Sequence, residues 1–153
     1  RLEAQSRDAT VKVMASSGGQ IAVGTGTVYR YEGHNIVVTA AHVIGEPPYL
    51  VAVLTQYEYV MAEVVYFDSE MDLAVLVIPD VPGLSSMPFR PAPERSIKIG
   101  TDVLYSGFPN DGELFTIRGI VGMPTAIEDV VLVIPISALN FDLLNFNIKE
   151  LDV

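Results

Sequence analysis

The sequence has no cysteine and few basic residues. Without cysteine, the chain can form neither a disulfide nor a thiol nucleophile, and its redox compartment stays open. Nine lysine and arginine residues stand against 19 aspartate and glutamate residues, which gives a formal net charge of −10. Such a charge repels phosphate backbones and anionic lipid headgroups. We therefore expect no nucleic-acid partner and no attraction to an anionic membrane.

Long apolar runs are also missing. No window reaches the roughly 18 apolar residues of a membrane-spanning helix, and no basic stretch followed by an apolar one resembles a signal peptide. We therefore expect no membrane span, and the sequence assigns no localisation. The chain begins with Arg1 rather than Met, so we expect residues that precede it to have been removed or to lie outside this sequence.

Short apolar runs are frequent, and half of the residues are hydrophobic. That content can bury the core of one domain or of two small barrels. Val and Ile recur in short runs between closely spaced Gly and Pro, which is typical of an all-β protein. Six strand-like segments precede Pro79 and are enough to close one barrel. They lie around Val11 and Val13 and at Gln20–Tyr31, Ile36–Thr39, Leu50–Thr55, Glu58–Phe67 and Leu73–Ile78.

Glycine and proline predict the connections between these strands. We expect turns at Ser16–Gly19 and at Glu32–Asn35. Gly24 and Gly26, inside a strand-like segment, indicate a bulge or the close approach of another backbone. Ala40–Ile44 is expected to form a short helical turn, ended by Gly45 and the two prolines that follow it.

The second half of the chain is less regular. Five prolines between Pro79 and Pro93 predict a stiff connection. Strand-like segments follow at Val103–Gly107, Leu114–Val121 and Asp129–Ile134, and Ser137 is placed to cap a short terminal helix that ends at Leu144. We therefore expect a barrel in residues 1–78, a connection in 79–100, and a partial second barrel with a terminal helix in 101–153.

Two residues indicate chemistry. His42 follows an apolar strand and Thr39-Ala40-Ala41, and Asp72 directly precedes the strand-like run Leu73–Ile78. A histidine that acts as general base for a hydroxyl nucleophile needs a buried carboxylate to hold its tautomer. A buried histidine at the end of a strand is more often a simple core residue. The two paired motifs together favour the catalytic interpretation.

Other polar residues have simpler explanations. His34 falls in a predicted turn, where we expect it to be solvated. The acidic residues Asp68, Glu70 and Asp72 could indicate a metal loop, but a solvated turn that leads to one buried aspartate explains them more simply. The two histidines lie on different elements, with no carboxylates placed to complete a ligand set. We therefore expect no metal site and no cofactor.

No serine has the context of a nucleophile. The chain has no Gly-x-Ser-Gly or similar Gly-flanked serine after Asp72. Ser16, Ser17, Ser85 and Ser86 fall in predicted turns or in the connection, and Ser106 precedes Gly107 on a predicted strand. The nucleophile that would complete a triad with His42 and Asp72 is thus unassigned.

Several motifs resemble those of a known family in the same order. They are Gly24-Thr25-Gly26-Thr27-Val28, Ile36–Thr39, Ala40–Ile44, Asp72–Ile78, Ser106-Gly107-Phe108-Pro109, Thr116–Val121 and Val131–Ser137. From about Val11 to Leu144 the chain resembles the trypsin-like serine proteases, which have the chymotrypsin fold, and within them the bacterial high-temperature-requirement branch.

The resemblance implies a fold of two six-stranded β-barrels, with His42 as general base and Asp72 as its orienting carboxylate. It breaks between Met123 and Pro124, where the family holds the nucleophile loop and its neighbouring strands. The second barrel is therefore expected to be incomplete, with two open edges and an uncovered apolar face. Either further residues belong between Met123 and Pro124, or a different chain supplies the missing strands of the second barrel.

Two functions remain open. The first is a serine endopeptidase that cleaves polypeptides with a serine from outside this sequence. The second is a catalytically inactive protease-fold module that binds a protein partner or has a structural part in a larger assembly, and fold alone does not choose between them. The alternating segment Asn145–Ile148 could also pair with a neighbouring chain in an oligomer. Retention of both His42 and Asp72 favours the enzyme, because a carboxylate buried beside an imidazole is costly.

Overall fold

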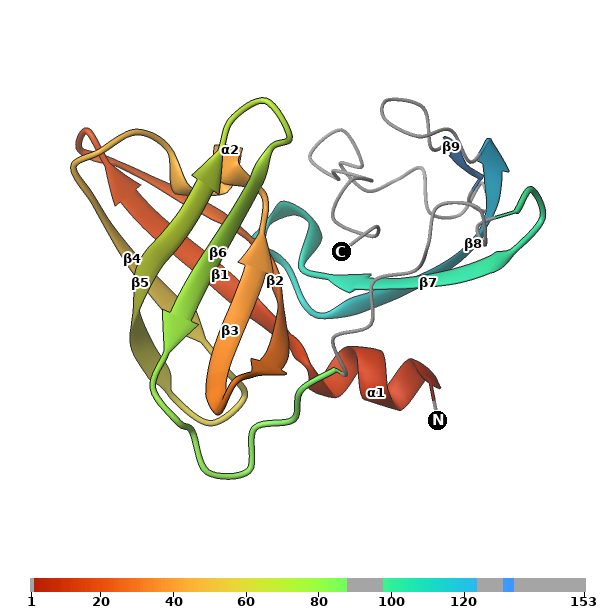
Figure 1. Cartoon of the computed structure of the whole chain (residues 1–153), viewed down its shortest axis with the longest axis horizontal. Helices are drawn as coiled ribbons and strands as arrows, with labels where there is room; N and C mark the ends of the chain where they lie inside the picture. The colour runs from red at the N-terminus through yellow and green to blue at the C-terminus, as the bar shows by residue number, and fades with distance from the viewer. Residues whose placement is uncertain (1, 88–97, 124–130, 134–153) are drawn as a thin grey trace.

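The computed structural model of the chain describes residues 2–87, 98–123 and 131–133. Strands dominate these residues, as the all-β prediction requires (Figure 1). The elements are α1 (Leu2–Asp8), β1 (Thr10–Ser17), β2 (Gln20–Tyr31), β3 (His34–Thr39), α2 (Ala41–Ile44), β4 (Tyr49–Leu54), β5 (Tyr59–Asp68), β6 (Leu73–Ile78), β7 (Asp102–Gly107), the 3-10 turn η2 (Pro109–Asp111), β8 (Phe115–Met123) and β9 (Val131–Val133). Among the described residues, no helix is long and apolar enough to cross a membrane.

The first six strands form a closed antiparallel barrel in the order β1-β2-β3-β6-β5-β4. Alternate residues of each strand point inward, and their small branched side chains fill the interior. The completely buried residues Val13, Val28, Val37, Val53 and Leu76 lie at the centre of this core. Six strands before Pro79 are what the sequence predicts.

β4 and β5 are each shifted by one residue from the prediction, because Thr55 and Glu58 close the turn between them. The Thr55 N–H donates to the Glu58 carbonyl (3.0 Å), and the Thr55 hydroxyl accepts from the N–H groups of Tyr57 and Glu58.

Two hairpin turns are tighter than predicted. Positive φ is confined to Gly18 and Gly19 in the first turn and to Glu32 and Gly33 in the second. Two central residues of this kind are typical of the tight type I′ hairpin, whose twist matches that of the strands. Ser16 and Ser17 therefore belong to β1, and His34 is the exposed first residue of β3 rather than part of a turn.

Gly24 and Gly26 do not form the predicted bulge. Both pair regularly with β1, opposite Val13 and Val11. The close approach is made by side chains instead of a backbone, since a Cβ on Gly24 would lie 2.5 Å from a methyl group of Val43, and one on Gly26 would overlap Val37. The irregular pairing in the barrel lies in β5, between Val64 and Tyr66.

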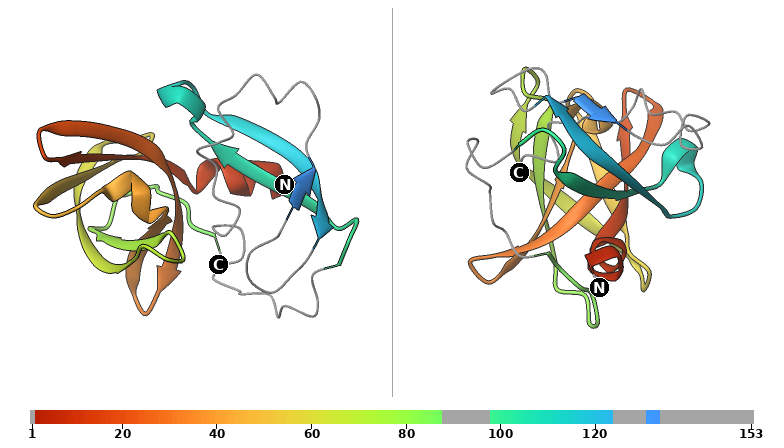
Figure 2. Two further views of the ribbon diagram at one scale, coloured as in Figure 1. Left: turned by 90° about the horizontal axis from the view of Figure 1, so that it is seen from above. Right: turned by 90° about the vertical axis from the view of Figure 1, so that its right-hand side faces the viewer.

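β7, β8 and β9 form a second, antiparallel sheet beside the barrel (Figure 2). These three strands were expected from the sequence, although only Val131–Val133 of the third predicted segment is described. Residues 79–87 lead away from β6, and the Met87 N–H donates to the Val28 carbonyl (2.8 Å). Four predicted features lie outside the described residues. They are residues 88–97 of the proline-rich connection, the join after Met123, the terminal helix and the Asn145–Ile148 segment.

Helix α1 was not predicted. It has no buried residue, and polar contacts hold it against the second sheet. The Ser6 hydroxyl hydrogen-bonds to that of Ser106 (2.8 Å), and the Arg7 guanidinium donates to the Thr116 hydroxyl (2.9 Å). Because α1 buries no residue, its sequence has no periodic apolar face that would predict a helix.

Candidate active site

His42 lies on α2, a single helical turn at one end of the barrel. Its neighbours Ala41, Val43 and Ile44 are buried, whereas the His42 side chain is 47% exposed. Gly45 ends the turn with a φ of 80°, and its N–H donates to the Ala41 carbonyl (3.3 Å). Burial of both flanks thus holds the turn against the core and leaves the imidazole at the surface.

Asp72 directly precedes β6. It has a φ of 55°, in the left-handed region that aspartate occupies more often than most residues. β6 pairs with β3 so that Ala74 lies opposite Thr39. This register brings the start of β6 beside the end of β3, and hence Asp72 beside His42.

The Asp72 carboxylate contacts His42 at two points. Its Oδ2 lies 2.7 Å from the imidazole Nδ1, and its Oδ1 accepts the backbone N–H of His42 at 2.8 Å. Both distances are typical of charge-assisted hydrogen bonds. With Nδ1 as donor to the carboxylate, the opposite ring nitrogen Nε2 is an acceptor, which is the arrangement a general base requires.

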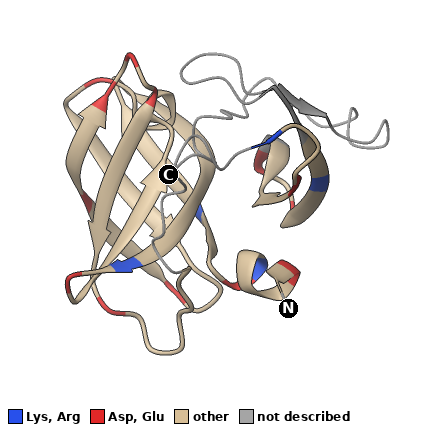
Figure 3. Cartoon of the chain, turned by 45° about the vertical axis from the view of Figure 1, so that its right-hand side comes forward, with Lys and Arg blue, Asp and Glu red and all other residues tan. Residues whose placement is uncertain are grey.

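The contact between the two residues agrees with the sequence-based expectation, but the predicted burial of Asp72 was wrong. Its side chain is 25% exposed, because Asp72 lies in the loop between β5 and β6 at the end of the barrel. Several acidic residues lie in such end loops (Figure 3). Solvent therefore reaches both the His42 and the Asp72 side chain at this end of the barrel.

Asp68 organises the loop that leads to Asp72. Its Oδ1 accepts the N–H groups of Glu70 (3.0 Å) and Met71 (3.1 Å), which forms an Asx turn. The Tyr66 hydroxyl donates to Asp68 Oδ2 (3.3 Å). The negative charge of Asp68 raises the pKa of Tyr66, and desolvation and this hydrogen bond add to the effect. No group of three potential metal-ligating side chains occurs among the described residues.

Two of the serines considered from the sequence, Ser106 and Ser17, form hydrogen bonds elsewhere. Ser106 is buried on β7 between the hydroxyls of Ser6 and Thr116, and the Ser17 hydroxyl donates to the Glu46 carbonyl. Ser85 and Ser86 lie in the segment after β6. Within residues 2–87, 98–123 and 131–133, no serine hydroxyl hydrogen-bonds to His42. A nucleophile is therefore not assigned among them.

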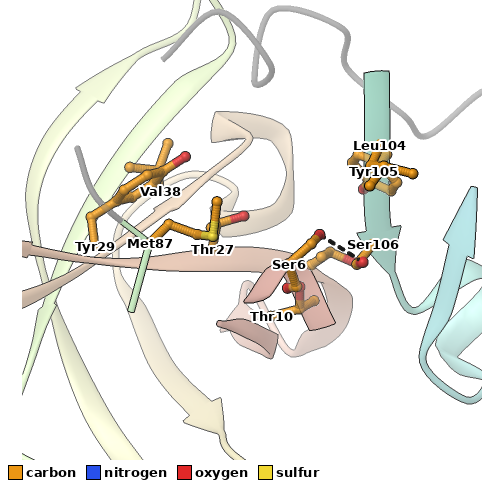
Figure 4. A pocket seen from close by; sticks show the side chains of 10 residues that line it. Ser6, Thr10, Thr27, Tyr29, Val38, Met87, Leu104, Tyr105 and Ser106 are labelled. Atoms are coloured by element: carbon orange, nitrogen blue, oxygen red, sulfur yellow. Dashed lines mark hydrogen bonds between the residues drawn. The ribbon is translucent and has the colours of Figure 1, made fainter. Parts of the chain in front are cut away.

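A pocket of about 200 Å³ lies at the junction of the barrel and the second sheet (Figure 4). Its lining is rich in hydroxyl groups and includes Ser6, Thr25, Thr27 and Ser106, but neither His42 nor Asp72. This pocket is separate from the histidine–aspartate pair and is not assigned to the candidate active site.

Comparisons with known proteins agree with this fold. Residues 24–132 match the trypsin-like peptidase domain. The serine endoprotease from Yersinia pestis is 26% identical with a TM-score of 0.64, over 78% of this chain and 42% of that one. The HtrA-type protease AlgW, solved with a tripeptide, is 21% identical with a TM-score of 0.65, over 78% of this chain and 38% of that one, and supports the fold alone.

This chain thus spans about two fifths of the length of those two solved proteins. A comparison with curated proteins finds no match. The family match covers more than half of the chain, including β2 from Gly24 onward, the His42 turn and Asp72. The chain therefore belongs to the trypsin-like peptidase family.

Proposed function

We propose that this chain carries the histidine and aspartate of a serine endopeptidase that hydrolyses peptide bonds in polypeptides. The observation that supports the proposal most directly is the two-point contact of Asp72 with His42, at 2.7 Å to the ring and 2.8 Å to the backbone N–H. A carboxylate held at both points restricts ring rotation and keeps Nδ1 as the donor. The partly exposed imidazole can then accept a proton at Nε2.

In the proposed reaction, a serine hydroxyl attacks the peptide carbonyl while His42 Nε2 takes its proton. The C–N bond of the tetrahedral intermediate then breaks, and the imidazolium gives the proton to the leaving amine. Water next attacks the serine ester with His42 again as general base, and the acid product and the serine hydroxyl are released. Asp72 stabilises the imidazolium throughout and does not itself take the proton. From the family resemblance we infer that the serine belongs to the side of the second barrel, at the break between Met123 and Pro124, and lies outside this sequence.

A second candidate function is a catalytically inactive module that uses the barrel as a structural or binding part. The observation that favours it is the absence of a Gly-flanked serine anywhere after Asp72 in the sequence. Such a module would retain the His42–Asp72 contact without a nucleophile to activate.

Labelling with a fluorophosphonate probe, which reacts with activated serines, distinguishes the two functions. Because the proposed serine lies outside this sequence, the test uses the intact natural protein rather than the 16.6 kDa chain alone. We expect that protein and a His34→Ala control to be labelled, and its His42→Ala variant to lose the label. His34 is the chain's other histidine and lies exposed at the start of β3, so it is a matched control. A folded protein with an intact mass near 16.6 kDa that takes no label would instead favour the inactive module.

A further inference from the structure

Thr25 contacts both sides of the junction between the barrel and the second sheet. Its hydroxyl Oγ1 accepts the backbone N–H of Phe108 at 2.9 Å. Phe108 directly follows β7, so this bond joins β2 to the second sheet. The Thr25 carbonyl accepts the hydroxyl of Thr39 at 2.8 Å. Thr39 is completely buried at the end of β3, three residues before His42.

The glycines around Thr25 leave little room for movement. A Cβ on Gly24 would lie 2.5 and 2.9 Å from the two methyl groups of Val43, the residue after His42. On the other side, a Cβ on Gly107 would lie 3.1 Å from the Thr25 hydroxyl. The backbones of Gly24 and Gly107 therefore pack closely against Val43 and Thr25. Because closely packed interiors transmit strain, a shift of Thr25 is transmitted both to α2 and to the end of β7.

A neighbouring residue strengthens the same junction. Lys12, which pairs with Thr25 across β1 and β2, reaches Asp111 Oδ1 at 2.8 Å and lies 5.1 Å from the centre of the Phe108 ring. Phe108 is therefore held at its backbone by Thr25 and at its ring by Lys12. These contacts tie the second sheet to the barrel beside β2, the strand that also contacts the His42 turn.

We propose that Thr25 is a positioning residue that fixes the His42 turn relative to the second sheet. This inference rests on the proposed function, in which the serine belongs to the side of the second barrel. The relative placement of the two sides then sets the distance between the serine hydroxyl and His42 Nε2. A misplacement of about 1 Å can lower a reaction rate about 10²-fold.

Thr25→Val tests the link directly, because valine keeps the shape of threonine but removes the acceptor of the Phe108 N–H. We expect hydrogen exchange of the Phe108 amide, followed by NMR, to become at least about tenfold faster. We also expect the His42 imidazole signals to shift. The chain has only two histidines, so a His34→Ala variant assigns these signals.

Two further variants separate positioning from a general loss of stability. Thr25→Ser keeps the hydroxyl and is expected to restore both the Phe108 exchange rate and the His42 signals. Thr55→Val is the matched control, since the Thr55 hydroxyl also accepts backbone N–H groups but within the β4–β5 turn. It is expected to lower the melting temperature without changing the Phe108 or His42 readouts.

The rate of fluorophosphonate labelling gives the functional readout. We expect it to fall about 10²-fold in Thr25→Val and to return in Thr25→Ser. Unchanged His42 signals in Thr25→Val would overturn the proposal, whether or not Phe108 exchanges faster. An equal fall in the labelling rate in Thr25→Val and Thr55→Val would also overturn it. Failure to label the unmodified protein would reject the proposed function, while the exchange and imidazole measurements would still decide the role of Thr25.

Discussion

At the scale of single residues, the two oxygens of Asp72 have different tasks. Oδ1 accepts the His42 backbone N–H and so helps to hold the α2 turn, whereas Oδ2 contacts the imidazole and orients it. An amide at this position can still accept one of the two hydrogen bonds. It cannot supply the charge that stabilises an imidazolium, and its NH₂ group favours the wrong tautomer when it faces Nδ1.

Asp72→Asn is therefore expected to slow fluorophosphonate labelling by about 10⁴-fold, as in other triads, while the protein stays folded. Asp68→Asn is the matched control, because Asp68 lies in the same loop and bonds to Glu70 and Met71 instead of His42. The labelling rate of this control should stay close to that of the unmodified protein. Similar rates for the two variants would contradict the orienting role of Asp72.

Asp68 also permits a test of local electrostatics. Its negative charge is the largest cause of the raised pKa of Tyr66, because a nearby carboxylate disfavours the phenolate. Removal of this charge in Asp68→Asn should lower the Tyr66 pKa towards the ordinary tyrosine value. An NMR titration of the Tyr66 ring signals measures this change. An unchanged or higher pKa would show that Asp68 is not the cause.

At the scale of elements, α2 depends on its surroundings. A turn of four residues is too short to form a stable helix by itself, so the burial of Val43 and Ile44 holds it in place. Val43 packs directly on Gly24, where a β-carbon would not fit. The position of His42 at the surface is thus a consequence of packing on both sides of it.

Gly24→Ala should consequently destabilise the fold by roughly 1–3 kcal/mol, the usual cost of overpacking a core. Urea unfolding measures this loss. A second substitution, Val43→Ala, removes the methyl groups that the new Cβ would meet, so the double variant should lose less stability than the sum of the two single variants. Additive losses would show that Gly24 and Val43 do not limit each other.

At the scale of the whole molecule, contacts between distant parts of the chain join helix α1 and the barrel to the second sheet. They include Ser6 with Ser106, Arg7 with Thr116, Lys12 with Asp111 and Thr25 with Phe108. We propose on this basis that the predicted units 1–78 and 101–153 form one cooperative structure, joined by residues 79–100, rather than two independent domains.

Thermal unfolding should then proceed in a single transition, and limited proteolysis should leave residues 79–100 mostly uncut. The physical reason is that the shared contacts would be lost together if either part unfolded. Lys12→Ala provides a graded test, since it removes one link and should lower the single melting temperature without splitting the transition. Release of two fragments that each melt cooperatively would contradict the proposal.

The sequence by itself determined the features that depend on neighbouring residues. The alternation of Val11 and Val13 with Lys12 and the short apolar run Leu73–Ile78 indicate strands, and Gly18-Gly19 indicates a turn. These predictions succeed because side-chain period and backbone freedom are local properties. The motifs around His42 and Asp72 were also sufficient to expect their contact, through a resemblance that covers most of the chain. That expectation agrees with the observed distance of 2.7 Å.

Tertiary structure alone decided the rest. The solvent exposure of Asp72, the packing of Val43 on Gly24 and the bond from Phe108 to Thr25 depend on which distant segments meet. The placement of helix α1 also depends on distant segments, since its Ser6 hydrogen-bonds to Ser106, 100 residues later in the sequence. A periodic pattern shows which face of a strand is apolar, but it does not show which distant residue packs against that face. For that reason the sequence indicated the candidate catalytic pair, whereas only the fold showed what holds the two residues in place.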